Sequence, residues 1–112
     1  MKPPQGTRTG GRIKQGRDRF QAFAVPCSGA DEALEAVRVL TASCGLEDAS
    51  HLSWALRPES GGSIMETKSD GGETGAGACI LDVLRKRNVT NTLVLVARWY
   101  GGRHLGSLRF RI

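Results

Sequence analysis

Residues Asp70–Gly106 read DGGETGAGACILDVLRKRNVTNTLVLVARWYGGRHLG, a stretch that predicts a turn, a helix, a strand and a loop in succession. Four closely spaced glycines mark the turn, since glycine adopts backbone conformations that other residues avoid. A helix is expected over Ala76–Arg87, where small and aliphatic residues recur with a helical period and the last turn is basic. The continuous apolar run Leu93–Ala97 predicts a strand that is covered on both faces.

Four elements are expected between the N-terminus and this stretch. Arg19–Val25 predicts a strand, which Pro26 ends because proline has no amide hydrogen to donate. A helix is expected between Ser28 and Gly45, since apolar residues recur there at helical spacing and glycine commonly ends a helix. Residues 50–57 alternate between apolar and polar side chains, which predicts a half-buried strand whose buried face carries Leu52, Trp54 and Leu56.

A weak strand over Ser63–Lys68 is expected to form a hairpin with the strand before it. The order of elements is then strand, helix, strand, strand, helix, strand. This order predicts an α/β (α+β) two-layer sandwich, in which one sheet carries both helices on a single face. Residues Leu108–Ile112 begin a helical pattern that the chain does not complete. The apolar surface left open would need a cover, for which a second copy of the chain, in a homodimer, is one candidate.

The length and composition indicate one domain. A chain of 112 residues is near the common size for a single core. Residues 1–17 are basic and rich in glycine and proline, so we expect a disordered basic tail, with the folded domain over residues 18–112. The chain has no apolar run near the ~18 residues that a membrane span needs. Its N-terminus does not resemble a secretory signal, and its three cysteines are widely spaced, which favours a cytoplasmic location.

Charge is unevenly distributed along the chain. Residues 1–19 carry six Lys/Arg against one acid, residues 20–84 carry three against ten, and residues 85–112 carry seven against none. Basic ends around an acidic middle suggest an electrostatic contact with nucleic acid, a ribosome or an acidic protein surface. A solvated tail with ordinary surface arginines is the alternative interpretation.

Catalytic and cofactor motifs are incomplete. Ile80 stands where a dinucleotide fingerprint needs its third glycine, and no lysine completes a phosphate loop. The cysteines and histidines lack zinc-site spacing, so no metal and no cofactor are expected. Cys79 lies on the expected apolar stripe of the helix and is interpreted as a core residue, and His51 as an exposed residue. Because no nucleophile, base and orienting group occur together, we expect no enzyme, and Glu73 with His51 is only a remote alternative.

Several segments resemble the IMPACT family. They are DGGETGAG (Asp70–Gly77), NVTNTLVLVARWYGG (Asn88–Gly102) and LGSLRF (Leu105–Phe110), with softer matches at DRFQAFAVP (Asp18–Pro26) and ASHLSWALR (Ala49–Arg57). The resemblance covers residues 17–112. It implies a fold like the second domain of the fifth small-subunit ribosomal protein. It also implies a role in translational regulation under stress, as in family members that resemble inhibitors of the starvation-activated kinase of a translation initiation factor.

Those family members compete for the kinase's large ribosome-associated activator, so the resemblance implies protein partners in starvation signalling or the ribosome. They do so with an additional RWD domain, to which nothing in these 112 residues corresponds. The sequence also departs from the family at Gly71, where a second acid is usual, and at Cys79, where a basic residue is frequent. Both departures would weaken a ligand site built from those groups.

We expect the turn and the aromatic loop to form one binding surface, and Gly101–Gly102 to let the loop fold back so that Arg98 approaches Glu73. The expected function is a non-enzymatic module that binds a protein or the ribosome. RNA binding through the basic tail and the basic C-terminal third is the alternative. The candidate binding residues are Asp70, Gly72, Glu73, Thr74, Arg98, Trp99, Tyr100, Gly101, Gly102 and Arg103.

Overall fold

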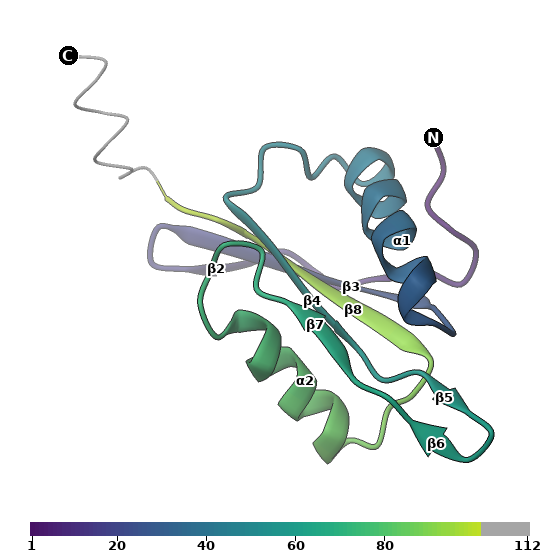
Figure 1. Ribbon diagram of the computed structural model, residues 1–112. Coiled ribbons are helices and arrows are strands. Elements are labelled where there is room, and N and C mark those ends of the chain that lie inside the picture. The colour runs from purple at the N-terminus through teal and green to yellow at the C-terminus, as the bar shows by residue number, and fades with distance from the viewer. Residues whose placement is uncertain (102–112) are drawn as a thin grey trace.

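A computed structural model of the chain describes residues 1–101 (Figure 1). The LGSLRF segment, the helical pattern at Leu108–Ile112, and the candidate residues Gly102 and Arg103 lie outside the described residues.

The central element of the fold is strand β8 (Thr92–Trp99), which pairs on one side with β3 (Asp18–Pro26) and on the other with β4 (His51–Leu56). The β7 strand (Thr67–Ser69) extends the sheet beyond β4, and all these pairs are antiparallel. A separate hairpin joins β5 (Glu59–Ser60) to β6 (Ser63–Ile64). The expected strand over Ser63–Lys68 is thus divided between β6, which pairs with β5, and β7, which pairs with β4, so the predicted antiparallel pairing with β4 is confirmed only from Thr67 onward.

Side chains of β8 alternate between two covered faces, as its apolar run predicts. Leu93, Leu95 and Ala97 are fully buried on one face, whereas Val94 and Val96 are half-buried on the other. Since successive side chains of a strand point to opposite faces, each face needs its own cover.

The two helices supply one cover each: α1 (Ala30–Ser43) packs Leu40 into the same cluster as Leu95, and α2 (Ala76–Lys86) packs Leu81 and Leu84 against Val94. They lie on opposite sides of the sheet (Figure 1). The α+β architecture with a mostly antiparallel sheet is confirmed, but the prediction that both helices share one face is wrong.

The physical reason lies in the second face of β4. Its residues Ser53 and Ala55 are small, so the alternation in the sequence indicates a solvent-exposed face. In the structure both are buried, at 3% and 0% exposure, because α2 covers them. Small side chains let the helix approach this face closely. The likeness to the ribosomal protein domain stays a prediction.

Helix α2 is rotated relative to the predicted stripe. Its buried residues are Gly77, Leu81 and Leu84, while Cys79 is exposed and Val83 is 50% exposed. The interpretation of Cys79 as a core residue is therefore wrong. Gly77 lies so close to the sheet that a Cβ at this position would be 2.9 Å from the carbonyl oxygen of Ser69. The face of α2 that packs on the sheet therefore combines Gly77 with Leu81 and Leu84.

The N-terminal segment is ordered against β3, so the expectation of a disordered tail over residues 1–17 is wrong. The short strands β1 (Arg8–Thr9) and β2 (Ile13–Gln15) both pair with β3 in antiparallel register. Between them, the amide of Gly10 donates to the Ala22 carbonyl at 2.8 Å. These contacts are mainly backbone hydrogen bonds, which polar residues form without any hydrophobic pattern. Neither helix of the described residues is long and apolar enough to cross a membrane.

Candidate functional site

Arg98, near the end of β8, holds the candidate site together. Its guanidinium pairs with Glu73 in the loop before α2, and with Asp18 at the start of β3 at 2.8 Å. It also lies 4.8 Å from the Tyr100 ring centroid and 5.2 Å from that of Phe20, within cation–π range. The hydrogen bond that Arg98 donates to Asp18 and the two nearby negative charges raise the pKa of Arg98. The expected approach of Arg98 to Glu73 is confirmed. Arg98 makes this contact from within strand β8.

Asp70 has a structural task at the beginning of α2. Its carboxylate accepts hydrogen bonds from the amides of Gly77 at 2.9 Å and Gly75 at 3.1 Å. These two bonds lower the pKa of Asp70, because backbone donors favour the ionised form. Its carbonyl oxygen accepts a bond from the Ser53 hydroxyl at 2.8 Å. Asp70 thus orders the turn and the helix start, so that its carboxylate is engaged within the protein.

His51 connects the turn to the aromatic loop, so it is not simply an exposed residue. Its Nδ1 lies 3.0 Å from the Gly71 carbonyl and its Nε2 lies 2.9 Å from the Tyr100 hydroxyl. Because a carbonyl only accepts, Nδ1 donates to Gly71, and Nε2 shares the second hydrogen bond with the Tyr100 hydroxyl. Gly71 has φ +58°, and a Cβ there would overlap the Leu52 carbonyl oxygen. The glycine at this position therefore fits the close approach of turn and strand.

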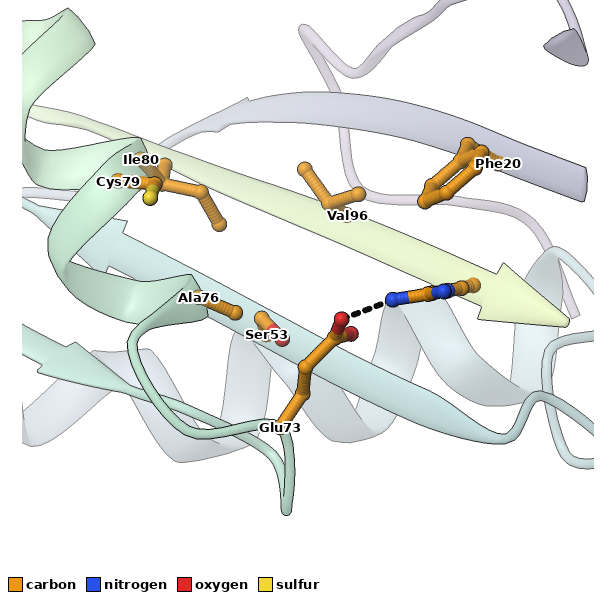
Figure 2. Close-up of a pocket in the computed structure, with 8 residues that line it drawn as sticks. Phe20, Ser53, Glu73, Ala76, Cys79, Ile80 and Val96 are labelled. Atoms are coloured by element: carbon orange, nitrogen blue, oxygen red, sulfur yellow. Dashed lines mark hydrogen bonds and ion pairs between the residues drawn. The ribbon is translucent and has the colours of Figure 1, made fainter. Parts of the chain in front are cut away.

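An apolar pocket of about 260 Å³ lies beside the Arg98–Glu73 pair, on the α2 side of the sheet. In Figure 2, Ala76, Cys79 and Ile80 of α2 border one side of it and Val96 of β8 its floor. Phe20 of β3 lies at the opposite end, and Glu73 reaches across toward β8 (Figure 2). The pocket exists because α2 leaves the β3 side of this face uncovered.

The structure separates Trp99 from the other candidate residues. Its ring is only 6% exposed, belongs to the core cluster on the α1 side, and donates from Nε1 to Asp48 at 3.0 Å. Successive residues of β8 face opposite sides, so Arg98 and Trp99 cannot share a surface. Tyr100, at 38% exposure, returns to the Arg98 side.

The glycines and Thr74 complete the candidate set. Gly101 donates its amide to Asp18 at 2.9 Å, and a Cβ on Gly101 would overlap the Arg17 carbonyl oxygen. Gly72 has φ +88° and lies against the His51 ring, where an added Cβ would be 3.2 Å from Nδ1. Thr74 is exposed in the same turn. The structure therefore brings the turn before α2 and the end of β8 together at one end of the sheet.

Sequence reasoning missed Asp18 and six residues that line the pocket: Phe20, Ser53, Ala76, Cys79, Ile80 and Val96. The spacing of Asp18 from Arg98, 80 residues, leaves no local signal. A predicted antiparallel pairing of β3 with β8 would have suggested this contact, because it brings Asp18 and Arg98 to the same end of the sheet. Within residues 1–101, no group of three or more His, Cys, Asp or Glu residues could hold a metal ion. Arg98, Glu73 and Asp18 are paired with one another, while Asp70 is bonded to backbone amides.

Comparison with known proteins gives consistent matches. The sequence pattern of the Impact N-terminal domain matches residues 16–112. Protein IMPACT of Rattus norvegicus is 34% identical over 104 residues, which are 91% of this chain and 33% of that protein. The Protein IMPACT homolog of Saccharomyces cerevisiae is 31% identical over 94 residues, or 82% of this chain and 36% of that protein. The chain thus spans about a third of these relatives' length.

A solved structure, that of the two-domain translational regulator Yih1, superposes with a TM-score of 0.71 at 31% identity. The superposition covers 99% of this chain and 44% of the Yih1 chain.

Proposed function

This chain belongs to the Impact N-terminal domain family, and from that premise we propose that it is a binding module of translational control. It acts by contacts with a protein or the ribosome, and it carries out no catalysis. The family includes a translational regulator, which supports the regulatory role. The partners that the resemblance implies are the ribosome and the ribosome-associated activator of the starvation-activated kinase.

One structural observation carries the proposal: a rigid charged clamp adjoins an uncovered apolar pocket. Arg98 is held by two carboxylates and two aromatic rings, so the clamp is ordered before any partner arrives. A preorganised surface loses little conformational entropy on binding. The exposed Tyr100 beside it is of the residue type enriched at binding hot spots.

The size of the pocket favours a protein partner. Its volume of about 260 Å³ lies just below the range of about 300–1,000 Å³ typical of small-molecule sites. It suits one or two apolar side chains of a partner segment. The polar rim at Glu73 and Arg98 surrounds this apolar centre, the usual anatomy of a protein interface.

The test uses purified ribosomes and the purified kinase activator, each in a co-sedimentation or pull-down assay. The variant Cys79→Glu places a charge in the pocket at an exposed position, so it should not impair folding. The matched control Ala78→Glu adds the same charge at the neighbouring exposed residue, which does not line the pocket.

We expect Cys79→Glu to weaken binding to one of these partners by about tenfold or more, a typical hot-spot effect. Ala78→Glu should bind like the native chain. The proposal is contradicted if neither partner binds the native chain, or if both variants bind equally well.

A further inference from the structure

A second pocket, of about 290 Å³, lies between the β2–β3 hairpin and the end of β8. Figure 1 shows this hairpin at the end of the sheet where β8 finishes, away from the β5–β6 hairpin. Three exposed basic residues line the pocket, together with Gly16, Tyr100 and Gly101; these bases are Lys14, Arg17 and Arg19. No acidic residue lines it.

The three bases lack acidic partners in the part of the chain that the structure describes. None of them forms an ion pair there. Asp18, the acid between Arg17 and Arg19 in the sequence, pairs instead with Arg98 and accepts the amide of Gly101. The neighbouring negative charge is therefore engaged with β8.

Two of the bases also oppose each other across the hairpin. Lys14 and Arg19 are direct cross-strand partners in the β2–β3 register. Like charges in this position destabilise a sheet, because their side chains are close and on the same face. An anion bound between them would relieve the repulsion.

The position of the hairpin is set by close backbone packing. Gly101 lies against the Arg17 carbonyl oxygen so closely that a Cβ would overlap it. The bond from its amide to Asp18 at 2.9 Å ties the end of β8 to the same turn. The basic pocket is thus built by two chain segments, and its charges do not depend on a loose tail.

From this geometry we propose that the pocket binds phosphate groups in the backbone of an RNA strand. Arginine pairs with phosphate through its planar fork and lysine as a point charge, and such contacts need no particular base. The choice of RNA rests on the proposed role in translational control. None of its three bases lines the apolar pocket, and Tyr100 lies between the basic pocket and Arg98.

The experiment measures binding of a fluorescent oligouridine of about 20 nucleotides by anisotropy, between about 50 and 200 mM salt. For three phosphate contacts we expect log K to fall with log salt at a slope of about −2. The double variant Lys14→Gln/Arg17→Gln should bind about tenfold or more weakly at about 50 mM salt, with a slope near −0.7. The single variant Lys14→Gln should fall between the two.

The matched control is Arg38→Gln/Lys86→Gln, which removes the same charge from two exposed helix residues that already pair with acids. It should bind RNA like the native chain. The inference is overturned if the native chain does not bind RNA, or if both double variants lose affinity equally.

It is also overturned if polyglutamate competes as well as RNA, which would indicate an acidic protein partner. Displacement of RNA by inorganic phosphate at about 10 mM would likewise replace it with a free-phosphate site, since multivalent backbone contacts outcompete single ions. None of these outcomes bears on the Cys79 assay, so failure of the RNA site and failure of the proposed function are distinguishable.

Discussion

Arg98 and Glu73 lie 25 residues apart in the sequence, yet their side chains pair and join the end of the central strand to the loop before α2. The pair is partly shielded, with side-chain exposures of 25% and 27%. It forms the rim of the apolar pocket and positions the loop that closes one end of it.

Removing either member should destabilise the fold. We expect Arg98→Ala to lower the free energy of unfolding by about 2 kcal/mol, since Asp18 and Glu73 would then face each other without a cation. Glu73→Gln should lower the free energy of unfolding by about 1 kcal/mol. Urea unfolding of both single variants and the double variant should give a coupling energy of about 1 kcal/mol. The exposed pair Glu35 and Arg38 is the control and should show weaker coupling. Additive effects at Arg98 and Glu73 would mean that the pair does not tie the two elements together.

Gly101 should be intolerant of any side chain. Gly101→Ala would push the end of β8 away from Arg17, and we expect a loss of about 1–3 kcal/mol of stability in urea unfolding. Gly11→Ala is the matched control, because no atom lies within 4 Å of a Cβ at that position. Equal stability of the two variants would show that β8 does not pack against the hairpin turn.

The order of the N-terminal strands shows where sequence reasoning reaches its limit. The continuous apolar run of β8 and the alternation of β4 were sufficient to predict both strands, and the helical period of α2 predicted the helix between them. Strands β1 and β2 have no apolar pattern, because they pair with β3 through backbone groups and polar side chains. Their burial patterns are wholly exposed, so hydrophobicity could not have indicated them.

The site was predictable to a similar extent. The motif resemblance and the charges led to Glu73, Arg98 and Tyr100, which the structure brings to one edge. Trp99 was included because it is adjacent in sequence, although strand alternation places it in the opposite core. Asp18 could not be found without the pairing of β3 with β8, which is a long-range property of the fold.

Asp70 should matter for the helix rather than for the partner. Asp70→Ala removes the acceptor for two amides at the start of α2, and we expect a lower melting temperature. Asp70→Asn keeps one oxygen acceptor, so its melting temperature should fall less than that of Asp70→Ala. The lowered pKa of Asp70 means that its contribution is present above the usual carboxyl pKa and is lost as the pH falls through the lowered value. Thermal melts from pH 7 downward should therefore show the Asp70→Asn deficit shrinking in acid, and a pH-independent deficit would contradict the capping role.

Glu66 links α2 to the sheet through Arg85 and Arg57. The hydrogen bond from Arg85, with a further contribution from Arg57, lowers the pKa of Glu66 to about 2. Its stabilising effect is therefore complete above the unfolded pKa near 4.3 and is lost as the pH falls toward about 2. We expect Glu66→Gln to melt at a lower temperature than the native chain at pH 7, with the difference in melting temperature shrinking below about pH 4 and most of it lost by about pH 2. Melting curves that stay equally separated at both pH values would contradict the linkage.

The most direct measurement of the central claim is the rate at which N-ethylmaleimide alkylates Cys79, with and without purified ribosomes or the kinase activator at saturation. Cys79 is exposed at the apolar pocket, while the buried Cys27 and the partly buried Cys44 serve as internal references. If the pocket is the binding surface, the bound partner should slow alkylation of Cys79 about tenfold or more, in line with desolvation at an interface core. An unchanged Cys79 rate in a complex that demonstrably forms would contradict the account.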